Sequence, residues 1–105
     1  MGLFSFLFGS GKKQQAIKDA LAAGHTVIDV RTPGEFKQGN FKGSINIPLN
    51  KIEGKAKSLT KEKQPVILCC RSGARAESAR GILAAQGVQA INAGAWQSVV
   101  KASRS

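Results

Sequence analysis

The apolar run at residues 65–69 constrains the fold more than any other part of the sequence, because it leads directly into Cys70 and the stretch Arg71-Ser72-Gly73. Its proline start and aliphatic side chains are typical of a strand buried inside a sheet. Residues 76–86 follow with apolar side chains at helical spacing, and Gly87 supplies a helix stop. A buried strand, a short loop and a helix in this order indicate one unit of a parallel α/β sheet.

The rest of the chain shows the same alternation of strand and helix signals. Residues 26–30 and 44–47 have the patterns of short strands, and Thr32-Pro33-Gly34 indicates a loop between them. Helices are predicted at residues 12–23, 49–58 and 95–102, and a last strand at residues 88–91. We therefore predict an α/β domain with a mainly parallel sheet.

Length and charge limit how the chain can be organised and what it can bind. At 105 residues it fits one compact domain, and a hydrophobic content of 42% is ordinary for a globular protein. Sixteen basic against six acidic residues give a net charge of +10, which favours anionic ligands or acidic partners. The Lys-rich stretch at residues 51–63 contains no aromatic residue, so we prefer a solvated basic face to nucleic-acid binding.

Residues 1–11 form an apolar N-terminal segment that ends in the Gly/Ser joint Gly9-Ser10-Gly11, and residues 12–105 form the single domain. The segment lacks the basic start and cleavage site of a secretory signal, which favours a cytoplasmic location. It is too short to cross a membrane. Two interpretations stay open, docking on a protein surface or peripheral membrane contact, and the second would use Leu3, Phe4, Phe6, Leu7 and Phe8.

The loop after Cys70 has the features of an anion-binding site. In a parallel sheet, ligands bind beyond the carboxyl ends of the strands, where loops lead into helices. The backbone N–H groups of residues 71–75 can surround an anion, and the following helix adds its partial positive charge. Gly73 permits unusual backbone angles, while Arg71 and Arg75 supply cations that lower a cysteine pKa. These features predict a stabilised Cys70 thiolate that attacks an anionic sulfur or phosphorus donor.

Three segments of the sequence resemble the signature segments of the rhodanese homology domain, in that family's order and spacing. They are residues 28–36, residues 39–48 and the loop Cys70-Arg71-Ser72-Gly73-Ala74-Arg75. With the flanking elements the resemblance covers residues 12–102. It implies a single module of the small thiosulfate sulfurtransferase type, an α/β fold whose central parallel sheet carries helices on both faces.

The resemblance also implies a mechanism and a set of site residues. Cys70 would take the outer sulfur of thiosulfate or a similar anionic donor, hold it as a persulfide and pass it to cyanide or a thiol, such as that of a thioredoxin-like protein. The substrate-binding residues would be Arg71, Ser72, Gly73, Ala74 and Arg75, and the supporting residues Asp29 and Arg31, which brace the loops. No metal or organic cofactor is expected.

Two other functions remain open at the level of the sequence. Counted from Cys69, the loop has the Cys-x5-Arg spacing of cysteine phosphatases, although the shorter spacing from Cys70 and the position of Gly73 favour sulfur transfer. A persulfide carrier or docking module without turnover would need the same Cys70. We interpret Cys69 as a small buried side chain rather than a resolving thiol, because neighbouring strand residues point apart. Trp96 lies either in the core or near the active site.

Overall fold

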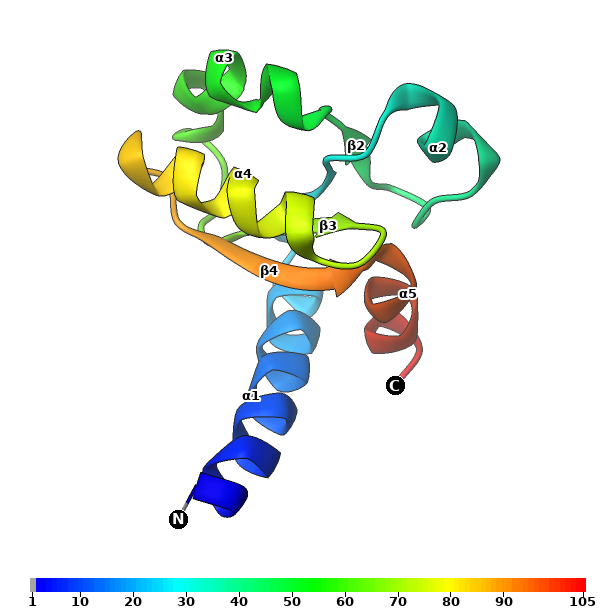
Figure 1. Cartoon of the computed structure of the whole chain (residues 1–105), viewed down its shortest axis with the longest axis vertical. Coiled ribbons are helices and arrows are strands. Elements are labelled where there is room, and N and C mark those ends of the chain that lie inside the picture. Colours follow the sequence, from blue (N-terminus) through cyan, green and yellow to red (C-terminus); the bar gives the residue numbers. More distant parts are fainter. Residues whose placement is uncertain (1) are drawn as a thin grey trace.

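The computed structural model describes residues 2–105, and their side chains from residue 11 onward. Its four strands form one parallel sheet in the order β2-β1-β3-β4 (Figure 1). The α/β fold with a parallel sheet is therefore confirmed. The elements in chain order are α1 (Gly2–Ala22), β1 (Val27–Asp29), α2 (Pro33–Gln38), β2 (Ile45–Asn46), α3 (Leu49–Leu59), β3 (Val66–Cys70), α4 (Ala74–Ala85), β4 (Ala90–Ala95) and α5 (Trp96–Arg104).

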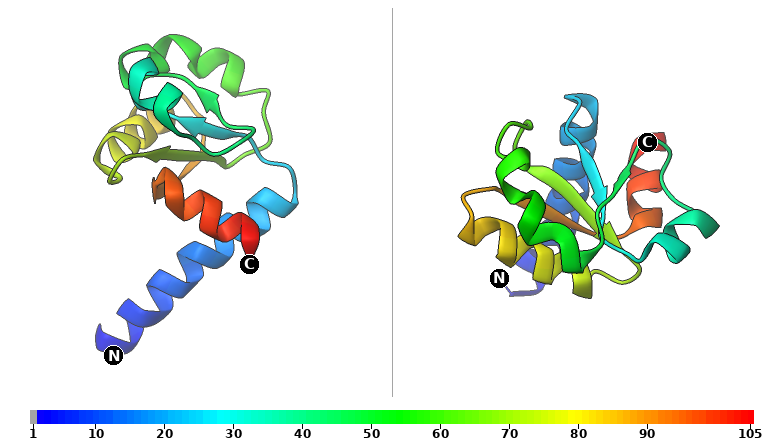
Figure 2. Two further views of the ribbon diagram at one scale, coloured as in Figure 1. Left: turned by 90° about the vertical axis from the view of Figure 1, so that its right-hand side faces the viewer. Right: turned by 90° about the horizontal axis from the view of Figure 1, so that it is seen from above.

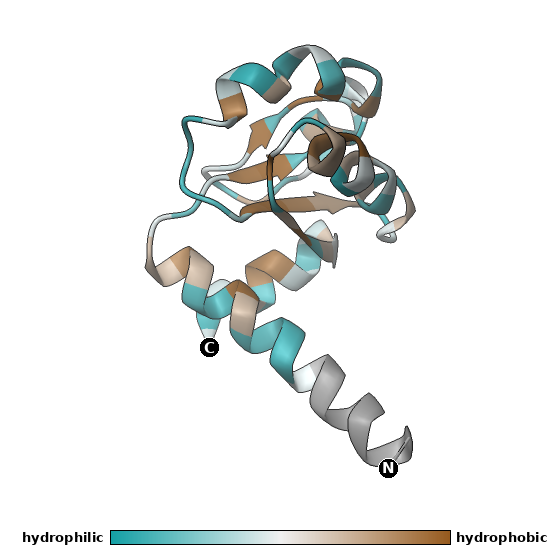
Figure 3. Cartoon of the chain, turned by 90° about the vertical axis from the view of Figure 1, so that its left-hand side faces the viewer, coloured by the Kyte–Doolittle hydropathy of each residue, from teal (hydrophilic) through white to brown (hydrophobic). Residues whose placement is uncertain are grey.

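Helices cover both faces of the sheet, as the family resemblance implies. Helices α3 and α4 pack together on one face, and α1 and α5 pack together on the other (Figure 2). Apolar residues are concentrated on the strands and on the helix sides that face them (Figure 3). Each face of the sheet thus has its own apolar cluster.

Strand β3 lies in the middle of the sheet and is fully buried. Because side chains alternate along a strand, Leu68 and Cys70 join the cluster beneath α3 and α4, whereas Ile67 and Cys69 join the cluster beneath α1 and α5. The two neighbouring cysteines therefore face opposite sides of the sheet, and both are free thiols.

Several element boundaries differ from those that the sequence predicts. Helix α1 begins at Gly2 and is helical through residues 9–11, so the joint expected there is not a break in the helix. Helix α4 begins at Ala74 rather than Ala76 because Gly73 adopts a left-handed conformation at its N-cap. Strand β4 lies two residues further along than predicted and is longer. The division into residues 1–11 and 12–105 stays a prediction.

Helix α2 is an element that the sequence patterns did not predict. Thr32 caps it through a reciprocal pair of hydrogen bonds with Glu35, and Pro33 occupies its first turn. The turn signal at Thr32-Pro33-Gly34 thus marks a helix start rather than only a loop.

The sequence leaves open whether the chain contacts a membrane. Within the described residues no helix is both long and apolar enough to cross a bilayer. The side chains of Leu3, Phe4, Phe6, Leu7 and Phe8 lie outside the described ones, so peripheral membrane contact stays an expectation.

Candidate active site

Cys70 is the last residue of β3, and its loop turns at once into α4. The strands are parallel, so the loops after β1, β3 and β4 leave the sheet at the same edge. Gly73, with a φ of 101°, directs its backbone N–H toward the Cys70 Sγ at 2.9 Å. A Cβ atom at Gly73 would stand 3.3 Å from the Cα of Gly94, so the loop needs glycine for space as well as for backbone angle.

The environment of Cys70 favours a thiolate. Burial raises its pKa, since only 1% of the residue is exposed. Backbone N–H groups of Ala76, Gly73, Ser72 and Arg75 oppose this effect by donating toward the sulfur, and the net result is a pKa below the ordinary value. Of these donors, the Gly73 N–H forms a hydrogen bond to the Cys70 sulfur at 2.9 Å, at the loop that the sequence predicts to bind an anion.

Cys69 has the opposite environment. Burial raises its pKa strongly, and the neighbouring Asp29 carboxylate raises it further. Its side chain faces α1 and α5, away from the loop that follows Cys70. A neutral thiol on that face is unsuited to nucleophilic attack, which disfavours the phosphatase interpretation that starts from Cys69.

Asp29 and Arg31 form a buried brace beneath the site. The Arg31 guanidinium donates from Nη2 and Nε to the two Asp29 carboxylate oxygens at 2.7 and 2.9 Å, and both residues are almost fully buried. Arg31 Nη2 also donates to the Gly39 carbonyl at 2.7 Å, and Nη1 donates to that of Glu35. The Arg31 side chain thus bonds to the carbonyl of Glu35 within α2 and to that of Gly39 at its C-cap.

The two loop arginines have different surroundings. Arg75 donates to the Glu35 carboxylate at 2.7 and 3.0 Å, which joins α4 to α2 and lowers the pKa of Glu35 to about 2. Arg71 is exposed and lines a cleft of about 360 Å³ beside the loop. Of the predicted substrate-binding side chains, Arg71 forms no ion pair with a described carboxylate and can bind an anion, while Arg75 is bound to Glu35. Ser72 and Ala74 are exposed and belong to the loop and to the start of α4.

Trp96 forms one wall of this cleft, which we call the Arg71 cleft. The Arg31 guanidinium carbon lies 5.3 Å from the centre of its ring, within the range of a cation–π contact. Gly39 also lines the cleft, and a Cβ there would approach the Trp96 ring to 3.3 Å. Trp96 packs partly against the core as well, so both positions considered from the sequence apply.

Two asparagines also support the site, and neither was singled out from the sequence. Asn92 on β4 donates to the Gly73 carbonyl at 3.0 Å and accepts from the Gly94 N–H at 2.9 Å, which ties the Cys70 loop to β4. Asn46 on β2 donates to the Arg31 carbonyl at 2.9 Å. Asn46 ends β2, and Asn92 directly follows the strand that the sequence predicts at residues 88–91 although it lies inside β4 in the structure. A polar residue after a predicted strand is the sequence signal that could have found each of them.

The comparisons with known proteins agree with this arrangement. A family model for the rhodanese-like domain matches residues 13–102. The chain belongs to this family. A rhodanese-related protein of Thermoplasma volcanium has the same fold as this rhodanese-like domain, with a TM-score of 0.69, 29% identity and coverage of 86% of this chain and 89% of that one.

Curated relatives of this rhodanese-like domain are named sulfurtransferases. It is 30% identical to the thiosulfate sulfurtransferase PspE of Escherichia coli over 69% of this chain and 71% of that protein. It is 34% identical to a sulfurtransferase of Allochromatium vinosum over 58% of this chain and 56% of that protein. The rhodanese-like domain spans less than two thirds of the length of several curated relatives that it matches.

Proposed function

We propose that the chain is a sulfurtransferase that moves sulfane sulfur from thiosulfate, or a similar anionic donor, through a persulfide on Cys70. The observation that supports this most directly is the ring of loop N–H groups around the Cys70 sulfur, which lowers its pKa. The same N–H groups suit a persulfide anion, since they favour negative charge at that position.

The first half-reaction is a displacement at sulfur. The Cys70 thiolate attacks the outer sulfur of thiosulfate, a new S–S bond forms, and sulfite leaves with the electron pair of the old S–S bond. Arg71, exposed at the cleft, binds the anionic donor. The loop amides then hold the terminal sulfur of the persulfide.

The second half-reaction discharges Cys70. An acceptor thiolate attacks the terminal sulfur, leaves as a persulfide and restores the Cys70 thiolate; cyanide in the same role leaves as thiocyanate. No proton donor is required in either step, because each nucleophile and each leaving group is an anion. Charge stabilisation by Arg71 and the loop therefore accounts for the catalytic contribution that we propose.

The test is the intact mass of the protein after incubation with thiosulfate. The wild type and Cys69→Ser should each gain one sulfur atom, and Cys70→Ser should gain none. Added cyanide should remove the extra mass and release thiocyanate. A mass gain that depends on Cys69 instead would contradict the assignment.

A persulfide carrier without turnover is the second candidate, because it would use the same cysteine. Steady-state release of thiocyanate from thiosulfate and cyanide separates the two. An enzyme gives many turnovers per Cys70, whereas a carrier that waits for its own partner gives one slow discharge.

A further inference from the structure

A second groove lies next to the Arg71 cleft and shares two lining residues with it. Trp96 and Gln97 line both the cleft and this groove, which has a volume of about 680 Å³, within the usual range for ligand sites of ~300–1,000 Å³. We call it the α5 groove, because α5 forms one side of it. The α2–β2 loop forms the other side, at residues 40–42.

The α5 groove combines apolar surface with three cationic side chains. Phe41, Trp96 and Val100 supply the apolar part. The cationic part consists of Lys42, Lys101 and Arg104. None of the described side chains that line the groove is acidic, and none of its three cations forms an ion pair with a described carboxylate.

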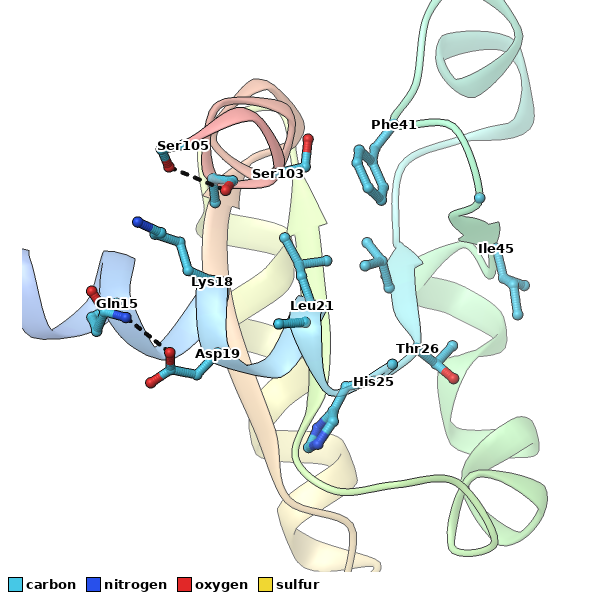
Figure 4. Close-up of a pocket in the computed structure, with 15 residues that line it drawn as sticks. Gln15, Lys18, Asp19, Leu21, His25, Thr26, Phe41, Ile45, Ser103 and Ser105 are labelled. Carbon is cyan, nitrogen blue, oxygen red and sulfur yellow. Dashed lines mark hydrogen bonds between the residues drawn. The ribbon is translucent and has the colours of Figure 1, made fainter.

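The depression on the far side of Phe41 differs in charge. It lies between α1, the C-terminal residues and the start of β1, and it contains the Asp19 carboxylate, which accepts from Gln15 at 2.8 Å (Figure 4). Phe41, Ser103 and Ser105 line both this depression and the α5 groove. The depression therefore contains both Lys18 and Asp19, whereas the described side chains that line the α5 groove include cations and no carboxylate.

We infer that the α5 groove docks an acidic segment of the protein that exchanges sulfur with Cys70. The inference rests on the proposed function and names its partner class. Lysine and arginine around aromatic surface recognise carboxylate-rich chain, and the net charge of +10 attracts such a partner from a distance. A segment in the groove lies against Trp96 and Gln97, which also line the cleft that contains Arg71. A thiol that follows this segment in the chain can therefore enter the cleft beside the Cys70 loop.

The probe for this inference is a synthetic peptide in which one cysteine is flanked by glutamates, with a matched peptide carrying glutamines in their place. Trp96 is the only tryptophan of the chain, so its fluorescence reports occupancy of the groove. Binding of the glutamate peptide should change the fluorescence and should exceed binding of the glutamine peptide. Transfer of sulfur from loaded Cys70 should be faster to the glutamate peptide.

Charge-reversal variants test whether the glutamate peptide binds at the α5 groove. Lys101→Glu with Arg104→Glu should weaken binding of the glutamate peptide about tenfold or more, because like charges would then face each other. Lys51→Glu with Lys55→Glu, on α3 across the sheet, changes the net charge equally and should change binding less than about twofold. The neutral pair Lys101→Gln with Arg104→Gln and the single Lys42→Glu should each weaken binding, which keeps the test valid if reversal at the end of α5 disturbs folding.

Two outcomes would overturn the inference. Equal loss in the α3 and α5 variants would show that only overall charge matters. Tighter binding of a single-stranded oligothymidine through Lys101 and Arg104 would assign the groove to nucleic acid instead. Loading of Cys70 by thiosulfate is measured separately by mass, so a chain that binds the peptide and does not load would contradict the proposed function while the docking site stands.

Discussion

The difference between Cys69 and Cys70 arises at the scale of single residues. The two thiols are neighbours in a buried strand, yet loop N–H groups lower the pKa of Cys70 whereas burial and the Asp29 carboxylate raise that of Cys69. Reactivity here depends on the direction in which each side chain points. The sequence predicts that opposition, because alternation along a strand is independent of the rest of the fold.

This difference predicts the pH dependence of alkylation. A thiolate reacts and a thiol does not, so the rate falls as pH falls through the cysteine pKa. For Cys70 that pKa is lowered, so iodoacetamide should modify it at pH values where an unfolded cysteine is already protonated. Peptide mapping should find the label on Cys70, and Cys69 should stay unlabelled until the protein unfolds. Equal labelling of both cysteines in the folded protein would contradict the prediction.

A second prediction at this scale concerns Gly73. Gly73→Ala places a side chain at a φ of 101° and against Gly94, so we expect a loss of ~1–2 kcal/mol in the free energy of unfolding and a large fall in the rate of Cys70 loading. Gly81→Ala in the middle of α4 is the matched control. Its Cβ meets no atom within 4 Å, and it should stabilise the helix by ~0.5–1 kcal/mol. Urea unfolding and mass-detected loading measure both effects.

At the scale of elements, the part of the site that could be predicted is the part formed by consecutive residues. The strand, loop and helix around Cys70 follow from local pattern, and their order places the loop at the carboxyl edge of the sheet. Asn46 and Asn92 could not be assigned in this way, because each reaches a loop that is distant in sequence. Which loops they meet depends on the strand order β2-β1-β3-β4, and residue pattern alone does not fix that order.

Helix α2 has a local sequence signal for a helix start, but the turn signal at the same residues concealed it. Proline and glycine at residues 33–34 indicate a turn, yet Thr32 and Glu35 have the spacing of a capping box.

The extent of β4, in contrast, has no local signal in the sequence. Its residues 92–95 have weak strand propensity and are extended because they pair with β3, so tertiary contact decides where the strand ends.

The cap of α2 can be tested by Thr32→Ala. Removing the hydroxyl leaves the Glu35 N–H without its acceptor, so we expect a loss of about 1 kcal/mol in the free energy of unfolding. Thr60→Ala at the end of α3 serves as the control. Its hydroxyl donates to a carbonyl at the surface, and the change should stay within about 0.5 kcal/mol. Equal losses of unfolding free energy in the two variants would show that the α2 cap stabilises the fold no more than a surface hydroxyl does.

At the scale of the whole molecule, the excess of positive charge should govern encounter with an anionic donor. Raising the ionic strength from about 0.01 M to about 1 M shortens the Debye length from ~30 to ~3 Å. The second-order rate of Cys70 loading by thiosulfate should therefore fall several-fold over this range. Circular dichroism at each salt concentration controls for unfolding. A rate that does not change with salt would mean that only groups in direct contact attract the donor.

The placement of the two thiols on opposite faces of the sheet also has a kinetic consequence. Both cysteines of the chain lie on β3, with their side chains on opposite faces of the sheet. Sulfur bound to Cys70 therefore cannot pass around the strand to Cys69. Under the proposed function, sulfur on Cys70 leaves only when a second molecule arrives. The lifetime of the loaded state is then set by the concentration of the acceptor rather than by the protein itself, so the domain would act as a reservoir whenever acceptors are scarce.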